Sequence, residues 1–137
     1  MKRLSVVIGG AAAAGLLALT VAPGWAHHAF SAEYDSTKPL TLRGTVTKVE
    51  WINPHVHFYM DVMDQTGAVA HWACQVGSPN ALQARGWKRG SLKVGDSVSV
   101  RAYRAKAGTN LVNARSVQLS SGAWIFAGSS GDFGPER

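Results

Sequence analysis

Residues 55–76 restrict the fold of this chain more than any other stretch, because apolar residues recur there at every second position. Alternate side chains of a strand point to opposite faces, so this period predicts two strands that share one apolar face. Between them, Asp64-Gln65-Thr66-Gly67 has the composition of a type I turn closed by a glycine in the left-handed conformation. The resulting hairpin pairs residues whose numbers sum to 132, and its apolar pairs are Val56–Val76, Phe58–Cys74, Met60–Trp72 and Val62–Ala70.

A short helix is predicted directly after the hairpin, because start and stop signals occur within ten residues. Ser78 is expected as the N-cap and Pro79 as the first helical residue, while Gly86 follows the end. Trp87 is then expected to fold back on Leu82. A helix of about two turns is unstable without packing, so we expect it to close one end of a sheet.

Four further segments have the composition of strands, and they cover residues 40–51, 97–104, 111–119 and 123–127. Gly44 predicts a bulge or a bend in the first of them, and Asn53-Pro54 predicts the corner before the hairpin. Three antiparallel strands, a short helix and two or three further strands follow the plan of the oligonucleotide/oligosaccharide-binding (OB) barrel. We therefore predict a mainly β fold: a small five- to six-stranded OB-like antiparallel barrel over residues 40–127, with one short helix between strands three and four. A small antiparallel sandwich is the alternative.

The first residues have the three parts of an export signal: the basic start Met1-Lys2-Arg3, an apolar run over residues 4–22, and small residues before a cleavage point. Cleavage is predicted after Ala26, which makes the protein exported and periplasmic, without stable membrane insertion after cleavage. An uncleaved anchor is the alternative, since the apolar run is about as long as a short membrane span. Residues 27–39 are then an irregular N-terminal arm, and residues 128–137, rich in glycine and serine, are a flexible tail.

Charge and cysteine content exclude several classes of protein. The formal net charge is +6, and removal of Lys2 and Arg3 with the signal would leave +4. Because the basic residues are scattered and form no dense patch, nucleic acid is not a predicted partner. Cys74 is the only cysteine and lies on an apolar face, so we predict a buried thiol and no disulfide within the chain. No paired nucleophile and base can be recognised by spacing, so we predict that the protein is not an enzyme.

Several short motifs occur together along the chain. They are His27-His28-Ala29-Phe30, Glu50-Trp51-Ile52-Asn53-Pro54-His55, Gly77-Ser78-Pro79-Asn80-Ala81-Leu82, Gly86-Trp87 and Asn113-Ala114-Arg115-Ser116-Val117. With them the chain resembles a family of small exported bacterial proteins of unknown function, over essentially the whole mature chain. The resemblance implies no established activity, so the function has to be argued from candidate sites.

Four histidines are candidate metal ligands. His55 and His57 lie two positions apart at the start of a predicted strand, so they share a face with Cα atoms about 6 to 7 Å apart. After cleavage, His27 would offer both its α-amine and its imidazole to one ion, with His28 beside it. Nitrogen-rich ligand sets favour Cu(II). We therefore predict a non-enzymatic exported binding protein that holds copper or another late transition metal. The alternative is that these histidines are solvated and bind no metal.

A metal-free binding surface is the alternative function. OB barrels bind ligands on the outer face of strands two and three, where a sugar, a peptide or an envelope protein would be the partner. Asp61 and His71 are also expected to form a cross-strand polar pair, and Glu50 to bind ligand or to orient an imidazole. The sequence does not predict the oligomeric state. The residues predicted to bind ligand on this surface are Tyr59, Asp61, His71, Gln75 and Glu50.

Overall fold

The computed structural model describes residues 30–128. The predicted export signal, His27 and His28, and the tail from residue 129 onward lie outside the described residues. Residues 30–33 are helical and lead directly into the first strand. Within the described part of the chain, no helix has the length and apolar character needed to cross a membrane.

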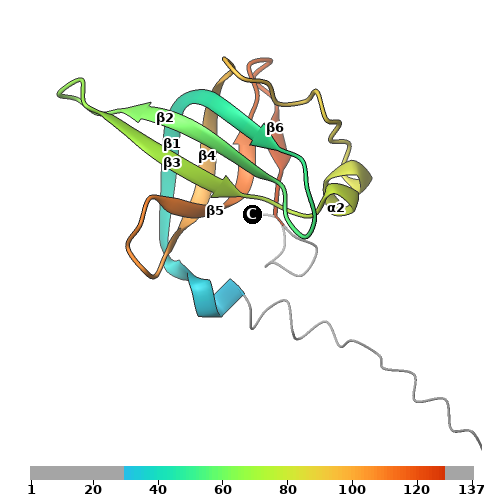
Figure 1. Cartoon of the computed structure of the whole chain (residues 1–137), viewed down its shortest axis with the longest axis horizontal. Helices are drawn as coiled ribbons and strands as arrows, with labels where there is room; N and C mark the ends of the chain where they lie inside the picture. Colours follow the sequence, from blue (N-terminus) through green and yellow to red (C-terminus); the bar gives the residue numbers. More distant parts are fainter. Residues whose placement is uncertain (1–29, 129–137) are drawn as a thin grey trace, which may run out of the picture.

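Six strands and the short helix α2 form a barrel within residues 30–128 (Figure 1). The strands follow the order β3-β2-β1-β4-β5-β6, and a parallel pairing of β3 with β5 closes five of them into a ring. The predicted mainly β, OB-like barrel with a helix after the third strand is therefore confirmed. The elements are β1 Tyr34–Glu50, β2 His57–Met63, β3 Val69–Gln75, α2 Pro79–Ala84, β4 Ser97–Ala105, β5 Leu111–Gln118 and β6 Trp124–Phe126.

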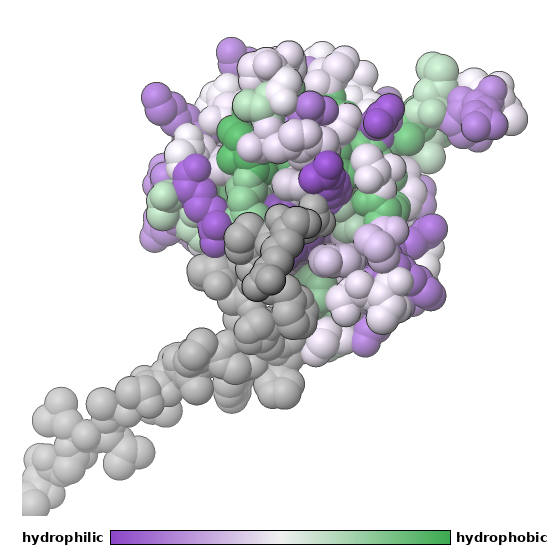
Figure 2. Space-filling model, turned by 180° about the vertical axis from the view of Figure 1, so that it is seen from behind, coloured by the Kyte–Doolittle hydropathy of each residue, from purple (hydrophilic) through white to green (hydrophobic). Residues whose placement is uncertain are grey.

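The hairpin of β2 and β3 has the predicted register. All seven observed pairs, from His57–Gln75 to Met63–Val69, have residue numbers that sum to 132. Gly67 closes the turn with a φ of 86°. The ladder starts at His57 rather than at the predicted residue 55. The Val56 amide donates to the carbonyl of Gly77, whereas the Val56 carbonyl accepts from the amide of Val76. Two different residues therefore bond to Val56, and the regular hydrogen-bond pattern of an antiparallel pair is interrupted there. The outer part of the hairpin projects beyond the barrel, with hydrophilic residues at its tip (Figures 1 and 2).

Strand β1 starts earlier than predicted. Tyr34 already pairs with Ala105 of β4, so residues 34–39 of the predicted irregular arm belong to a strand, and within the described residues only 30–33 of that arm are outside the sheet. No alternation of apolar residues indicates a strand here, because residues 36–39 are polar or proline and are exposed. Aromatic packing holds the segment instead: Phe30 and Tyr34 are buried in a small cluster together with Ala105.

Gly44 lies where the backbone of β2 passes closest to β1. A Cβ atom on Gly44 would lie 2.0 Å from the carbonyl oxygen of Asp61. The predicted irregularity of β1 is present, but the register shifts three residues later, between Val46 and Lys48. Gly44 therefore serves close packing of two backbones, and the bulge is a separate feature.

Helix α2 closes one end of the barrel, as predicted. The Ser78 side chain accepts a hydrogen bond from the amide of Ala81, at 3.2 Å. At the other end, the amide of Trp87 donates to the carbonyl of Leu82 and that of Gly86 donates to Gln83, which is the predicted Schellman motif. The Trp87 indole nitrogen donates to the carbonyl oxygen of Phe126 at 2.9 Å and fixes the helix to the end of β6.

Removal of the N-cap hydroxyl should weaken the barrel measurably. We expect Ser78→Ala to lower the free energy of unfolding by about 1 kcal/mol, because the Ala81 amide would lose its partner. The measurement is urea unfolding followed by circular dichroism. Ser78→Asp should retain most of the stability, because a carboxylate also caps a helix. Equal stability of the alanine variant and the parent would show that the cap contributes nothing.

Candidate functional site

His55 and His57 are held by main-chain carbonyls on one side of each ring. His55 Nδ1 lies 3.2 Å from the carbonyl oxygen of Val76, and His57 Nδ1 lies 3.2 Å from the carbonyl oxygen of His55. A carbonyl oxygen only accepts hydrogen bonds, so Nδ1 carries the hydrogen in both neutral rings. The lone pair of each Nε2 is then available to a metal ion.

The described residues do not complete a metal site. No group of three or more histidine, cysteine, aspartate or glutamate side chains within residues 30–128 is arranged to hold an ion. Cys74 is fully buried, and this burial raises the pKa of its thiol far above the usual value. The other two predicted ligands, His27 and His28, lie outside the described residues. A metal held by His55 and His57 therefore needs donors from the N-terminal segment or from solvent.

The first part of the described chain is held next to Gln75, the residue that pairs with His57. The Tyr34 hydroxyl donates to Gln75 Oε1 at 2.7 Å, and Gln75 pairs with His57 across β2 and β3. The Phe30 ring lies 5.6 Å from the Tyr34 ring and 5.9 Å from the Tyr103 ring, measured between centroids. Gln75, predicted to bind ligand, thus anchors the N-terminal segment.

Glu50 forms a small polar cluster with Lys48 and Tyr59. The Tyr59 hydroxyl donates to Glu50 Oε2 at 2.9 Å, and Lys48 forms an ion pair with Glu50 Oε1. The hydrogen bond from Lys48 and then that from Tyr59 hold the pKa of the Glu50 carboxyl below its usual value. The hydrogen bond to Glu50 is also the main cause that raises the pKa of Tyr59. Glu50 is therefore an ionised carboxylate with a partner on each oxygen.

Asp61 and His71 form the predicted cross-strand pair. His71 Nδ1 lies 2.5 Å from Asp61 Oδ1. The Asp61 side chain is 38% exposed and the His71 side chain is 83% exposed. Together with the Glu50–Tyr59 and Tyr34–Gln75 bonds, this pair gives every residue of the predicted ligand surface a partner within the chain. A ligand on the outer face of β2 and β3 would have to replace these contacts.

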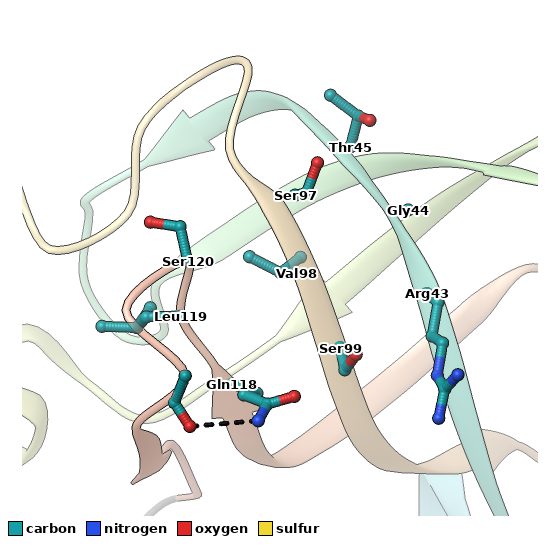
Figure 3. A pocket seen from close by; sticks show the side chains of 10 residues that line it. Arg43, Gly44, Thr45, Ser97, Val98, Ser99, Gln118, Leu119 and Ser120 are labelled. Atoms are coloured by element: carbon teal, nitrogen blue, oxygen red, sulfur yellow. Dashed lines mark hydrogen bonds between the residues drawn. The ribbon is translucent and has the colours of Figure 1, made fainter.

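The sequence did not point to a groove that lies on another face of the barrel. It has a volume of about 620 Å³ and is open to solvent between β1, β4 and β5 (Figure 3). The alternating Ser97-Val98-Ser99-Val100 segment was the one available signal, and it indicates only which side of β4 faces outward. The lining residues are Arg43, Gly44, Thr45, Ser97, Val98, Ser99, Gln118, Leu119, Ser120 and Gly122.

Comparison with known proteins places the chain in a family. Among solved structures, the chain is similar to Rim1, a mitochondrial single-stranded DNA binding protein from S. cerevisiae, with a TM-score of 0.48 and 10% sequence identity over 61% of this chain and 93% of that chain. No curated protein matches the chain. A family profile matches residues 14–113, which is most of the chain. The chain belongs to this family, which is described as a family of unknown function, DUF6152.

Proposed function

We propose that this protein is an exported, non-enzymatic binding protein for Cu(II) or a related late transition metal. The observation that carries the proposal is the pair of half-buried imidazoles, His55 and His57, whose Nδ1 atoms are both engaged by main-chain carbonyls. This arrangement fixes the tautomer and leaves two Nε2 donors. Imidazole is a ligand that suits copper, and Cu(II) has the highest affinity among the common divalent ions of the first row.

The N-terminal segment supplies the remaining donors in this proposal. Cleavage after Ala26 would give His27 a free α-amine next to its imidazole, and an amine of ordinary pKa near 7.7 to 8 loses its proton readily to a metal. Two residues lie between His27 and Phe30, and a link of this length spans at most about 11 Å. Burial of Phe30 and Tyr34, with the Tyr34–Gln75 hydrogen bond, supports the approach of this segment to the strand that begins at His57.

A metal-free module that binds a sugar, a peptide or an envelope protein on the outer face of β2 and β3 is the second candidate. It is supported by the exposure of the Asp61–His71 pair, because an exposed ion pair contributes only about 0 to 1 kcal/mol and a ligand can replace it. This function predicts binding that does not depend on metal and is lost when Tyr59 or Gln75 is changed. If such changes leave every interaction intact, the surface is not the binding site.

The state of the N-terminus tests the copper proposal. We expect protein that begins at His27 to bind about one equivalent of Cu(II), and protein with one additional methionine before His27 to bind it at least about 10-fold more weakly, since the added residue removes the amine from the imidazole. Isothermal titration in a weakly coordinating buffer gives the affinities, and intact mass gives the processed terminus. The methionine-extended protein is a matched control, because its described residues are identical. Equal affinity of the two forms would contradict the proposal.

A further inference from the structure

We propose a second binding site, for an acidic oligosaccharide, in the groove between β1, β4 and β5 and along the row of side chains that continues from it to Trp124 of β6. This site does not use the histidines, and it adjoins the outer face of β2 and β3 only where Thr45 is opposite Asp61. Three observations support it: the side chains form a row across neighbouring strands, most of their polar groups have no hydrogen-bond partner, and the charged side chain among them is positive.

Four side chains form one row across four strands. Arg43 of β1 is opposite Ser99 of β4, Ser99 is opposite Gln118 of β5, and Gln118 is opposite Trp124 of β6. Residues opposite each other in an antiparallel pair project to the same face of the sheet. Neighbouring strands lie about 4.8 Å apart, so the row extends over about 14 Å. This length suits a chain of sugar units better than a single ion.

A second set of hydroxyl groups lies beside this row. Thr45 is opposite Ser97, two residues along the strands from the Arg43–Ser99 pair, and Ser120 follows Gln118 beyond the end of β5. Figure 3 shows these side chains around one groove, with Arg43 on β1 and Ser120 across from it. The volume of about 620 Å³ lies within the range of about 300 to 1,000 Å³ for small-molecule sites.

Most polar side-chain groups of the groove have no partner within the described residues. Within residues 30–128, the side chains of Arg43, Ser97 and Ser99 make no hydrogen bond or ion pair. Gln118 donates from Nε2 to the carbonyl of Gly122 at 3.0 Å, which leaves its Oε1 as an acceptor. In the next row, the buried hydroxyl of Ser116 has no hydrogen-bond partner. The face of β2 and β3 differs, because its polar side chains are paired with one another.

The chemistry of the lining selects the class of ligand. Hydroxyl and amide groups both donate and accept, as the hydroxyls of a sugar require. Trp124 is 38% exposed, and the Arg101 guanidinium lies over its ring, 4.2 Å from the ring centre, so the far end of the row has a partly exposed aromatic ring with a cation stacked on it. Arg43 is the one charged residue among those that line the groove, and its planar guanidinium matches a carboxylate with two parallel hydrogen bonds. A saccharide that carries carboxylates meets all three features.

Other anions fit this groove less well. Free phosphate would contact Arg43 but could not reach Trp124, three strands away. Nucleic acid is bound mainly through several phosphate contacts to lysine and arginine, and the groove lining has one such side chain. Phosphate and a single-stranded oligonucleotide are therefore included in the test as competing ligands.

NMR titration of the mature protein with tetragalacturonate and with neutral maltotetraose tests the proposal. We expect the acidic tetramer to shift the amide signals of Ser99 and Gln118, and to bind at least about 10-fold more tightly than the neutral one, because charge-assisted hydrogen bonds are the stronger ones. Arg43→Gln should weaken binding about 10-fold, and Trp124→Ala should weaken it as well. Arg89→Gln, an exposed arginine in the connection between α2 and β4, should change the affinity less than about twofold.

Several results would overturn the proposal. One is the absence of shifts at Ser99 and Gln118 with either tetramer, and another is an equal loss of affinity in the Arg43→Gln and Arg89→Gln proteins, which would indicate general attraction to a basic surface. Tighter binding of inorganic phosphate or of a single-stranded oligonucleotide at these residues would assign the groove to that ligand instead. Binding by the His57→Ala protein should equal that of the parent, so failure of the metal proposal and failure of this one are distinguishable.

Discussion

Gly44→Ala should lower the free energy of unfolding by about 3 kcal/mol, the upper part of the usual range for overpacking. The added Cβ would lie 2.0 Å from the carbonyl oxygen and 2.9 Å from the carbonyl carbon of Asp61. These are main-chain atoms of β2, so relief of the clash requires movement of the strand that carries His57 and Tyr59. In a domain of this size, such a loss lowers the midpoint of thermal unfolding by roughly 10 to 20 °C.

Gly90→Ala is the matched control for this substitution. A Cβ on Gly90 would have its nearest neighbour, the Cε of Lys93, at 3.9 Å, so there is space for a methyl group. We expect a change within about 0.5 kcal/mol, the usual range for surface positions. Thermal and urea unfolding of the two variants and the parent give the comparison. If Gly44→Ala and Gly90→Ala both change the free energy of unfolding only slightly, the backbones of β1 and β2 are farther apart at Gly44 than described above.

The parts of the fold that the sequence predicted are those encoded by local patterns. The register of the hairpin follows from a period of two and from one turn, and α2 follows from Ser78, Pro79 and Gly86, all within a short stretch. The early start of β1 has no such signal, because aromatic packing holds Tyr34 against Ala105, 71 positions later in the chain. The parallel pairing of β3 with β5 also cannot be recognised locally, since it depends on closure of the whole ring.

In the candidate sites, too, only the features encoded in a short stretch of sequence could be predicted. The His55–His57 pair was visible because both histidines lie in one short motif, whereas the carbonyl partners that set their tautomers come from the fold. Gln75 stays a predicted ligand residue, and the fold adds a contact that no local pattern indicates: its side chain accepts a hydrogen bond from Tyr34, 41 positions away. The row from Arg43 to Trp124 takes one residue from each of four strands, and only Gln118 and Trp124 are close together in the sequence, so no local pattern indicates it.

His57→Ala should reduce the affinity for Cu(II) at least about 100-fold, a larger loss than the 10- to 100-fold typical for residues that only orient a ligand. In the proposed site this substitution removes one of the two fixed Nε2 donors, at the point where β2 pairs with Glu50 of β1 and Gln75 of β3. The side chain is half-buried and its one hydrogen bond is to the carbonyl of His55, so the barrel should remain folded. Titration of the mature protein with Cu(II), with circular dichroism as the test of folding, measures the effect.

His71→Ala separates a specific site from general binding of copper by imidazoles. His71 is on the same outer face, but its ring is paired with Asp61 and 83% of its side chain is exposed. It lies opposite Asp61, four residues along β2 from His57, which is about 13 Å at the rise of a strand and too far for one ion to bind both. We therefore expect its removal to change the affinity less than about twofold, whereas adventitious copper would be lost as readily from this exposed ring as from His57. Equal losses in the two variants would assign copper to scattered surface histidines, and the pair at the start of β2 would then have no role in metal binding.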